Sequence, residues 1–255
     1  MDGINDTTLG EGEYIFGETC TVEVFPENGY DFDCFLIDSN IIDENPYSFT
    51  MPDKDVTINA YASILTYSIT YDKNTNASVS NMPTTGTKYH GQTYTLPSNI
   101  PTRTGYEFKG WSLTTLPEGT IFKPGGYYTE DGDCTLYAQW ELKKYAITYF
   151  KNAGNTTDKF LEEYKDHGTT YYITAETPTR EGYKFLGWST NSAATTPMAT
   201  YTAGSPYRTN AIRKLYAVWE VNLFTITLNH QGGTASISSV KWQYNTQKWF
   251  NSSGS

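Results

Sequence analysis

The sequence is poor in the residues on which most enzymes depend. It has three cysteines and three histidines among 255 residues, and it contains no Cys-x-x-Cys, His-Glu-x-x-His or Gly-x-Ser-x-Gly motif and no phosphate-binding loop. His90 and His167 each precede a glycine and lie 77 residues apart, in equivalent places of two repeats, so they do not combine into one triad. The sequence therefore predicts a protein that is not an enzyme and has no cofactor.

The scarcity of cysteine leaves two alternatives open. Cys20 and Cys34 lie on neighbouring predicted strands and are the one pair placed to form a bridge, whereas Cys134 is alone. The alternative, which so sparse a set favours, is that all three thiols are free, because small folds held by disulfides are rich in cysteine. No metal site is indicated either, since Asp131-Gly-Asp133 lacks the further oxygen ligands that calcium needs.

Positive charge and long apolar runs are also scarce. Charged residues make up 18% of the chain, the formal net charge is -10, and the basic residues form no patch. This balance argues against nucleic acid and anionic membrane surfaces as partners. The chain has neither a signal peptide nor an apolar run long enough to cross a bilayer, so we expect no membrane insertion in this segment.

What the sequence does contain is a repeated motif rich in aromatic residues and glycine. The string Gly-Tyr-Glu-Phe-Lys-Gly-Trp at 105–111 returns as Gly-Tyr-Lys-Phe-Leu-Gly-Trp at 182–188, and a weaker copy occupies 29–35. The three copies start at Gly29, Gly105 and Gly182, which are 76 and 77 residues apart. A period of this length is too long for a solenoid unit and fits one small domain.

Three other short motifs recur in the same order along the chain, and together with the aromatic motif they predict four segments. The first, 1–64, is a divergent repeat that lacks its opening strand; 65–142 and 143–221 are full repeats; 222–255 is an incomplete repeat. We therefore expect a fragment of a longer protein, with its export signal and anchor outside this sequence. The stretches between the repeats, near 141–144 and 220–223, are short and not rich in glycine or serine, which favours an elongated rod.

Alternation of large apolar and small polar residues, as at 67–71 and 135–140, predicts strands within each segment. The one helix-like stretch is 157–164, but its counterpart near 78–85 carries Pro83, which favours strand or irregular structure there. Strand alternation points Tyr137 and Tyr216 away from the core, which makes them the candidate ligand-facing residues. The sequence predicts a repeat core made of Tyr106, Phe108, Trp111, Trp140, Tyr183, Phe185, Trp188 and Trp219.

Residues 101–111 with 136–140, and 178–188 with 215–219, resemble the Listeria–Bacteroides repeat, the family that includes the B repeat of internalins. The first segment is similar to a related, divergent bacterial surface repeat. The resemblance implies a β-rich α+β fold made of tandem small β-grasp-like (ubiquitin-like) domains. It also implies an extracellular place on the bacterial cell surface and no known catalytic residues.

Three functions fit these expectations. The first is a non-catalytic spacer or stalk of a cell-surface or secreted protein. The second is an adhesin module that binds a host glycan or surface protein through the outer face of the sheet. The third is a fibre component, including one of a phage, that self-associates by strand exchange: the spare strand at 224–228 would fill the place of the strand missing from the first segment.

Overall fold

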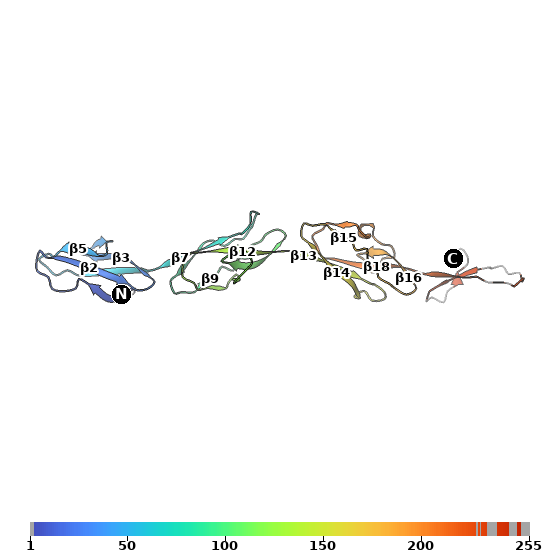
Figure 1. Cartoon of the computed structure of the whole chain (residues 1–255), viewed down its shortest axis with the longest axis horizontal. Coiled ribbons are helices and arrows are strands. Elements are labelled where there is room, and N and C mark those ends of the chain that lie inside the picture. The colour runs from blue at the N-terminus through green and yellow to red at the C-terminus, as the bar shows by residue number, and fades with distance from the viewer. Residues whose placement is uncertain (1–2, 228, 230, 234–238, 245–248, 251–255) are drawn as a thin grey trace. The chain divides into compact units, whose positions relative to one another are not determined.

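The computed structural model describes residues 3–227, 229, 231–233, 239–244 and 249–250 (Figure 1). These residues form strands almost throughout, and the only helical element among them is a single 3-10 turn, η1 (Ala199–Tyr201). The chain divides into two compact units, Met1–Glu141 and Leu142–Ser255. The first unit holds the first two predicted segments except residue 142, and the second unit holds that residue and the last two segments.

The first segment contains two three-stranded sheets. One has the order β1-β2-β5, with β1 (Ile4–Leu9), β2 (Thr19–Pro26) and β5 (Tyr47–Thr50). The other has the order β4-β3-β6, with β3 (Tyr30–Ile37), β4 (Asn40–Ile42) and β6 (Ile58–Ile64). The first strand, β1, pairs antiparallel with β2 and has no aromatic residue of the kind that marks the opening strands of the full repeats. It lies in a different sheet from β6, the last strand of the segment, so the absence of an equivalent opening strand stays a prediction.

The second segment is built around one four-stranded sheet with the order β10-β12-β7-β8. Its first strand, β7, runs parallel to the last strand, β12, and antiparallel to β8. The strands are β7 (Thr66–Asp72), β8 (Gly86–Tyr89), β10 (Tyr106–Ser112) and β12 (Cys134–Leu142), with a short antiparallel ladder of β9 (Tyr94–Thr95) and β11 (Tyr127–Tyr128) beside them.

The third segment repeats this arrangement, with the sheet order β14-β13-β18-β16. Its strands are β13 (Lys144–Phe150), β14 (Lys159–Asp166), β16 (Tyr183–Ser189) and β18 (Arg213–Val221), and the ladder is β15 (Tyr171–Tyr172) with β17 (Pro206–Tyr207). The pairing of β16 with β18 shifts register between Phe185 and Gly187. Gly187 has a φ of +146°, so this bulge uses a backbone conformation that favours glycine, and it precedes the buried Trp188.

The described part of the last segment is an antiparallel sheet of β19 (Leu223–Thr227), β20 (Ser239–Gln243) and β21 (Trp249–Phe250). The strand predicted at 224–228 corresponds to β19, which pairs with β20 within the chain; its last residue, 228, lies outside the described residues.

The predicted α+β class, with β-grasp-like domains, is wrong. An α+β domain packs a helix against its sheet, and no α-helix occurs among the described residues. The helix-like stretch at 157–164 instead enters β14, which pairs antiparallel with β13 from Lys144↔Asp166 to Phe150↔Lys159. In both full repeats, irregular chain and a two-residue ladder strand lie where a helix would have to connect the second strand to the next strand of the sheet.

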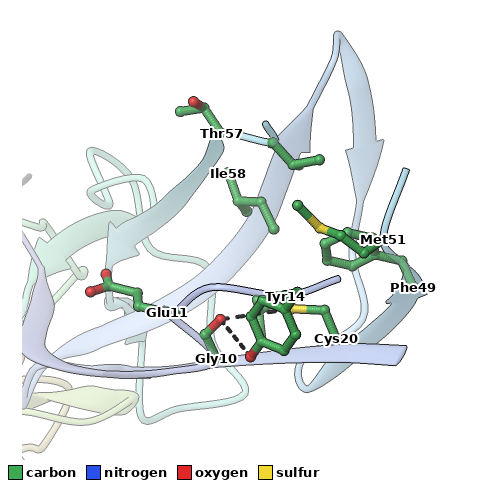
Figure 2. Close-up of a pocket in the computed structure, with 11 residues that line it drawn as sticks. Gly10, Glu11, Tyr14, Cys20, Phe49, Met51, Thr57 and Ile58 are labelled. Carbon is green, nitrogen blue, oxygen red and sulfur yellow. Dashed lines mark hydrogen bonds between the residues drawn. The ribbon is translucent and has the colours of Figure 1, made fainter. Parts of the chain in front are cut away.

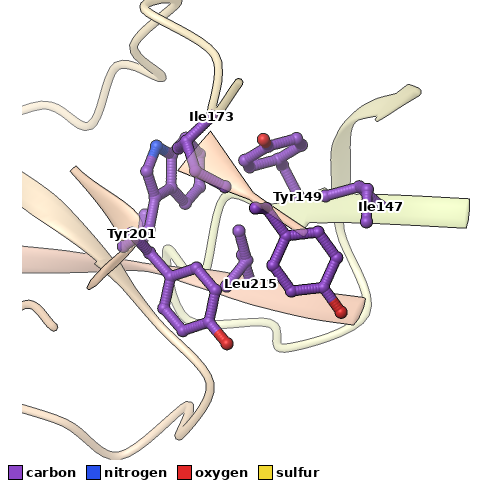
Figure 3. Packing of buried hydrophobic residues seen from close by; sticks show 8 residues of the cluster. Ile147, Tyr149, Ile173, Tyr201 and Leu215 are labelled. Atoms are coloured by element: carbon purple, nitrogen blue, oxygen red, sulfur yellow. The ribbon is translucent and has the colours of Figure 1, made fainter. Parts of the chain in front are cut away.

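Each full repeat has its own apolar core beside the parallel strand pair. In the third segment, Ile147 and Tyr149 from β13 meet Leu215 from β18, and Ile173 and Tyr201 cover them (Figure 3). The second segment has the same core, built from Ile69, Leu96, Trp111, Tyr128, Leu136 and Ala138. Cores this small depend on large rings, because an aromatic side chain removes about 150–250 Å² from water.

Candidate functional site

The predicted core tryptophans fall into two kinds. Trp111 and Trp188 are buried, and each packs edge-on against a tyrosine of the opening strand, with the centroids of Trp188 and Tyr149 4.8 Å apart. Trp140 and Trp219 are half-buried at the rim of the core. Their indole N–H groups donate to backbone carbonyls of the connection after the opening strand, at Lys73 (2.9 Å) and Lys151 (2.8 Å).

The other four predicted core residues also differ in their placement. Phe108 and Phe185 are partly buried and pack on the two cores. Tyr106 and Tyr183 were expected in the core but belong to neither cluster. Both are half-buried, and a guanidinium covers each ring at 3.6 Å from its centroid: Arg103 over Tyr106, and Arg180 over Tyr183. The first tyrosine of the repeat motif therefore forms a cation–π pair at the edge of the sheet.

The two predicted ligand-facing tyrosines lie at the same place in their repeats but have different neighbours. Tyr216 is half-buried and stacks on Phe150, with the ring centroids 5.1 Å apart and the planes 19° apart. Tyr137 is also half-buried, but the residue opposite it on β7 is Asp72. The third segment therefore presents a stacked aromatic pair where the second presents an aromatic ring beside a carboxylate.

The first segment contains an open cavity of about 330 Å³. Figure 2 shows Tyr14 and Cys20 on its floor, with the tyrosine hydroxyl and the thiol both donating to the carbonyl oxygen of Gly10. Phe49 and Met51 form an adjacent apolar wall. All three cysteine thiols of the chain are free, so the Cys20–Cys34 bridge that was one of two alternatives is not formed.

The second segment contains a buried lysine surrounded by polar groups. This cluster was not predicted from the sequence. Lys88 on β8 has a fully buried side chain, and its ammonium forms an ion pair with Asp131. Asp131 also accepts hydrogen bonds from the backbone N–H of Gly91, at 3.1 and 3.2 Å. His90 Nδ1 lies 3.2 Å from the second oxygen of this carboxylate and 2.9 Å from the hydroxyl of Tyr67.

These contacts set the charge of the cluster. The hydrogen bond from Lys88 is the main cause that holds the pKa of Asp131 below its ordinary value, and the Gly91 N–H adds to it, while desolvation opposes both. The carboxylate therefore stays ionised near neutral pH. A buried ammonium needs such a partner, because an unpaired charge is costly to remove from water.

The third segment builds the same cluster with one change. Lys165 on β14 is buried and donates to Oδ1 of Asn210 at 2.7 Å. The N–H of Gly168 donates to the same oxygen at 3.0 Å, and the His167 ring lies between Tyr145 and Asn210. A signal for both clusters is present in the sequence, since Lys-Tyr-His-Gly at 88–91 and Lys-Asp-His-Gly at 165–168 share the pattern Lys-x-His-Gly.

Comparison with protein families supports the division of the chain into repeats. Residues 67–139 and 145–218 each match the model of the Listeria-Bacteroides repeat domain. The chain belongs to this repeat family. Residues 3–61 match a second model, described as a divergent InlB B-repeat domain, so both resemblances expected from the sequence are confirmed. The family is typical of bacterial surface proteins and is generally non-enzymatic.

Two relatives from Evansella cellulosilytica are similar to this repeat chain. One, described as a putative Gly-rich membrane protein, is 31% identical over 77% of the chain and 22% of its own length. The other, described as a putative membrane protein, is 29% identical over 56% of the chain and 20% of its own length. The chain thus spans about a fifth of the length of these curated relatives. Within the part of the chain that the structure describes, no helix is long and apolar enough to cross a membrane.

Proposed function

We propose that this repeat chain is a non-catalytic spacer of a bacterial cell-envelope protein, exposed on the outer surface of the cell. The observation that carries the proposal is the junction between consecutive segments, which is one residue long. Leu65 alone separates β6 from β7. Its N–H donates to the carbonyl of Gly29 at 2.8 Å, and its carbonyl accepts from the N–H of His90 at 2.9 Å.

The junction between the third and fourth segments repeats this pattern. Asn222 donates to the carbonyl of Gly182 at 2.9 Å and accepts from the N–H of Tyr244 at 3.2 Å. A linker whose only residue is bonded on both sides has little freedom to bend, unlike a glycine- and serine-rich linker that behaves as a coil. Stiff junctions between small repeated domains suit a protein part that holds something at a distance.

Small-angle X-ray scattering of the purified chain tests the proposal. A segment of this size is about 30 Å across, so we expect a maximum dimension on the order of 100 Å. The control is a variant with a flexible Gly-Ser insertion after Leu65, in which the distance distribution should broaden. A compact wild-type particle would contradict the spacer. A particle of twice the chain mass would instead favour assembly by strand exchange.

A second candidate function is adhesion through the outer face of the sheet. The stacked Phe150 and Tyr216 favour it, because a flat aromatic surface can bind a sugar ring. If the protein binds on a glycan and mucin array, Tyr216→Ala should abolish the signal. Tyr137→Ala is the matched variant, since that ring lies opposite Asp72 and not opposite a second aromatic residue. Absence of binding by the folded protein would reject adhesion to these glycans.

A further inference from the structure

The two lysine clusters differ chemically in the group that faces the amine. In the second segment this group is the carboxylate of Asp131, and in the third it is the carboxamide of Asn210. Among the described residues, Lys165 forms no ion pair. Its amine donates to two neutral oxygens, Oδ1 of Asn210 and the backbone carbonyl of Asp166 at 3.2 Å, and lies 5.8 Å from the ring centroid of Tyr145. A buried amine and a primary amide thus lie side by side, and together they hold the atoms of a new amide bond.

The surroundings of Asn210 match the needs of acyl transfer. The Gly168 N–H, 3.0 Å from Oδ1, polarises the carbonyl and would stabilise the negative charge that develops on this oxygen. His167 Nε2 lies 3.5 Å from Nδ2, the atom that would leave. The Tyr145 hydroxyl is 3.0 Å from His167 Nδ1, and when this hydroxyl accepts from Nδ1–H, Nε2 is left unprotonated and faces the Nδ2 donor.

We propose that Lys165 and Asn210 form an intramolecular amide cross-link. The unprotonated Nζ of Lys165 attacks Cγ of Asn210 and forms the new C–N bond. The bond from Cγ to Nδ2 then breaks, and Nδ2 leaves as ammonia. His167 Nε2 takes the proton that the attacking Nζ loses and passes it to Nδ2, so the only products are the cross-link and one molecule of ammonia. No oxidant, metal or cofactor takes part.

The second segment is the internal comparison, and it is not expected to react. An ionised carboxylate is a poor electrophile, and Asp131 is kept ionised by the ion pair with Lys88. Formation of the amide in the third segment removes a buried amine that has no carboxylate partner, whereas in the second segment it would remove a satisfied ion pair. The difference between aspartate and asparagine at one position therefore decides the chemistry.

The cross-link would join β14 to the connection that precedes β18. The two residues are 45 positions apart, so the bond would close a long loop across the sheet of the third segment. A covalent tie of this kind restricts the unfolded chain, as a disulfide does, but a reducing agent does not break it. This inference goes beyond the spacer function and stands without it.

Intact-mass and peptide mass spectrometry of the full chain test the proposal. The wild-type mass should be lower than the sequence mass by one ammonia, and a digest should contain one peptide pair joined at residues 165 and 210. Lys165→Arg should restore the full mass. This control also separates the cross-link from succinimide formation at Asn210, which loses ammonia without needing the lysine.

The exchange of the two side chains gives the sharpest comparison. Asn210→Asp should end the loss of ammonia, because it recreates the ion pair of the second segment, and it provides a second variant if Lys165→Arg does not fold. Asp131→Asn should cause an additional loss of ammonia and join residues 88 and 131. An unmodified wild-type mass with no joined peptide would overturn the proposal. If the third segment forms its cross-link but Asp131→Asn forms none in the second segment, the role given to the asparagine would be overturned.

Discussion

At the scale of single residues, Asp131 makes the folded second segment sensitive to acid. Its folded pKa lies below the ordinary value of an aspartate, mainly because Lys88 bonds to the carboxylate. The stabilisation is therefore complete above about pH 4 and is lost as the pH falls through the lowered folded pKa. We expect Asp131→Ala to speed hydrogen exchange in β8 and β12 at pH 7 and to have a smaller effect as the pH is lowered below about 4, measured against wild type at each pH.

The matched control for this titration is Asn210→Ala. Neither the amide of Asn210 nor the cross-link proposed above titrates in this range, so the effect of their removal on β14 and β18 should not change as the pH is lowered. An Asp131→Ala effect that persists unchanged in acid would show that the aspartate acts through packing and not through its charge.

The burial of some of these residues could be predicted from the sequence, and that of others could not. The buried Trp111 and Trp188 follow from the size of the ring and the small size of the domain. Tyr106 was misplaced because the sequence does not show that Arg103 covers its ring. Lys88 and Lys165 were missed for a different reason: a lysine in a sequence indicates surface, and burial appears only when its partner from a distant loop is in place.

At the scale of elements, strand pairing overrides local preference. Phe160, Leu161 and Tyr164 have the spacing of an amphipathic helix. They nevertheless lie in β14, where Thr148 of β13 donates a side-chain hydrogen bond to Glu162 at 2.9 Å, and this pairing is non-local. The strand β1 was not predicted either, since Ile-Asn-Asp-Thr-Thr-Leu contains Asn and Asp, which are depleted in strands, and its strand conformation depends on pairing with β2. Strands with a clear alternation of apolar and polar residues were therefore predictable from the sequence. The remaining strands were not, because they depend on pairing with strands distant in the sequence.

At the scale of the whole molecule, the junctions connect these elements into a repeated chain. Gly29 and Gly182 open equivalent copies of the motif and have φ values of +88° and +72°. A Cβ atom at Gly29 would overlap the ring of His90, and one at Gly182 would overlap the ring of Tyr244. Each glycine thus contributes its carbonyl to the linker residue and leaves space for a ring of the following segment. The glycine of the motif, which looks like a turn residue in the sequence, is also a contact between segments.

The last prediction separates these two roles of the glycine. Gly17 has a φ of +86°, nearly the same as Gly29, but a Cβ atom there would meet nothing within 4 Å. Gly17→Ala and Gly29→Ala should therefore share a backbone strain of about 1 kcal/mol, whereas only Gly29→Ala should displace His90 and release the amide of Leu65. Hydrogen exchange at Leu65 and His90, read by NMR, should accelerate in Gly29→Ala and stay near the wild-type rate in Gly17→Ala. Equal acceleration in both variants would mean that the backbone strain alone loosens the junction, and the packing of the ring against the glycine would then have no part in its stiffness.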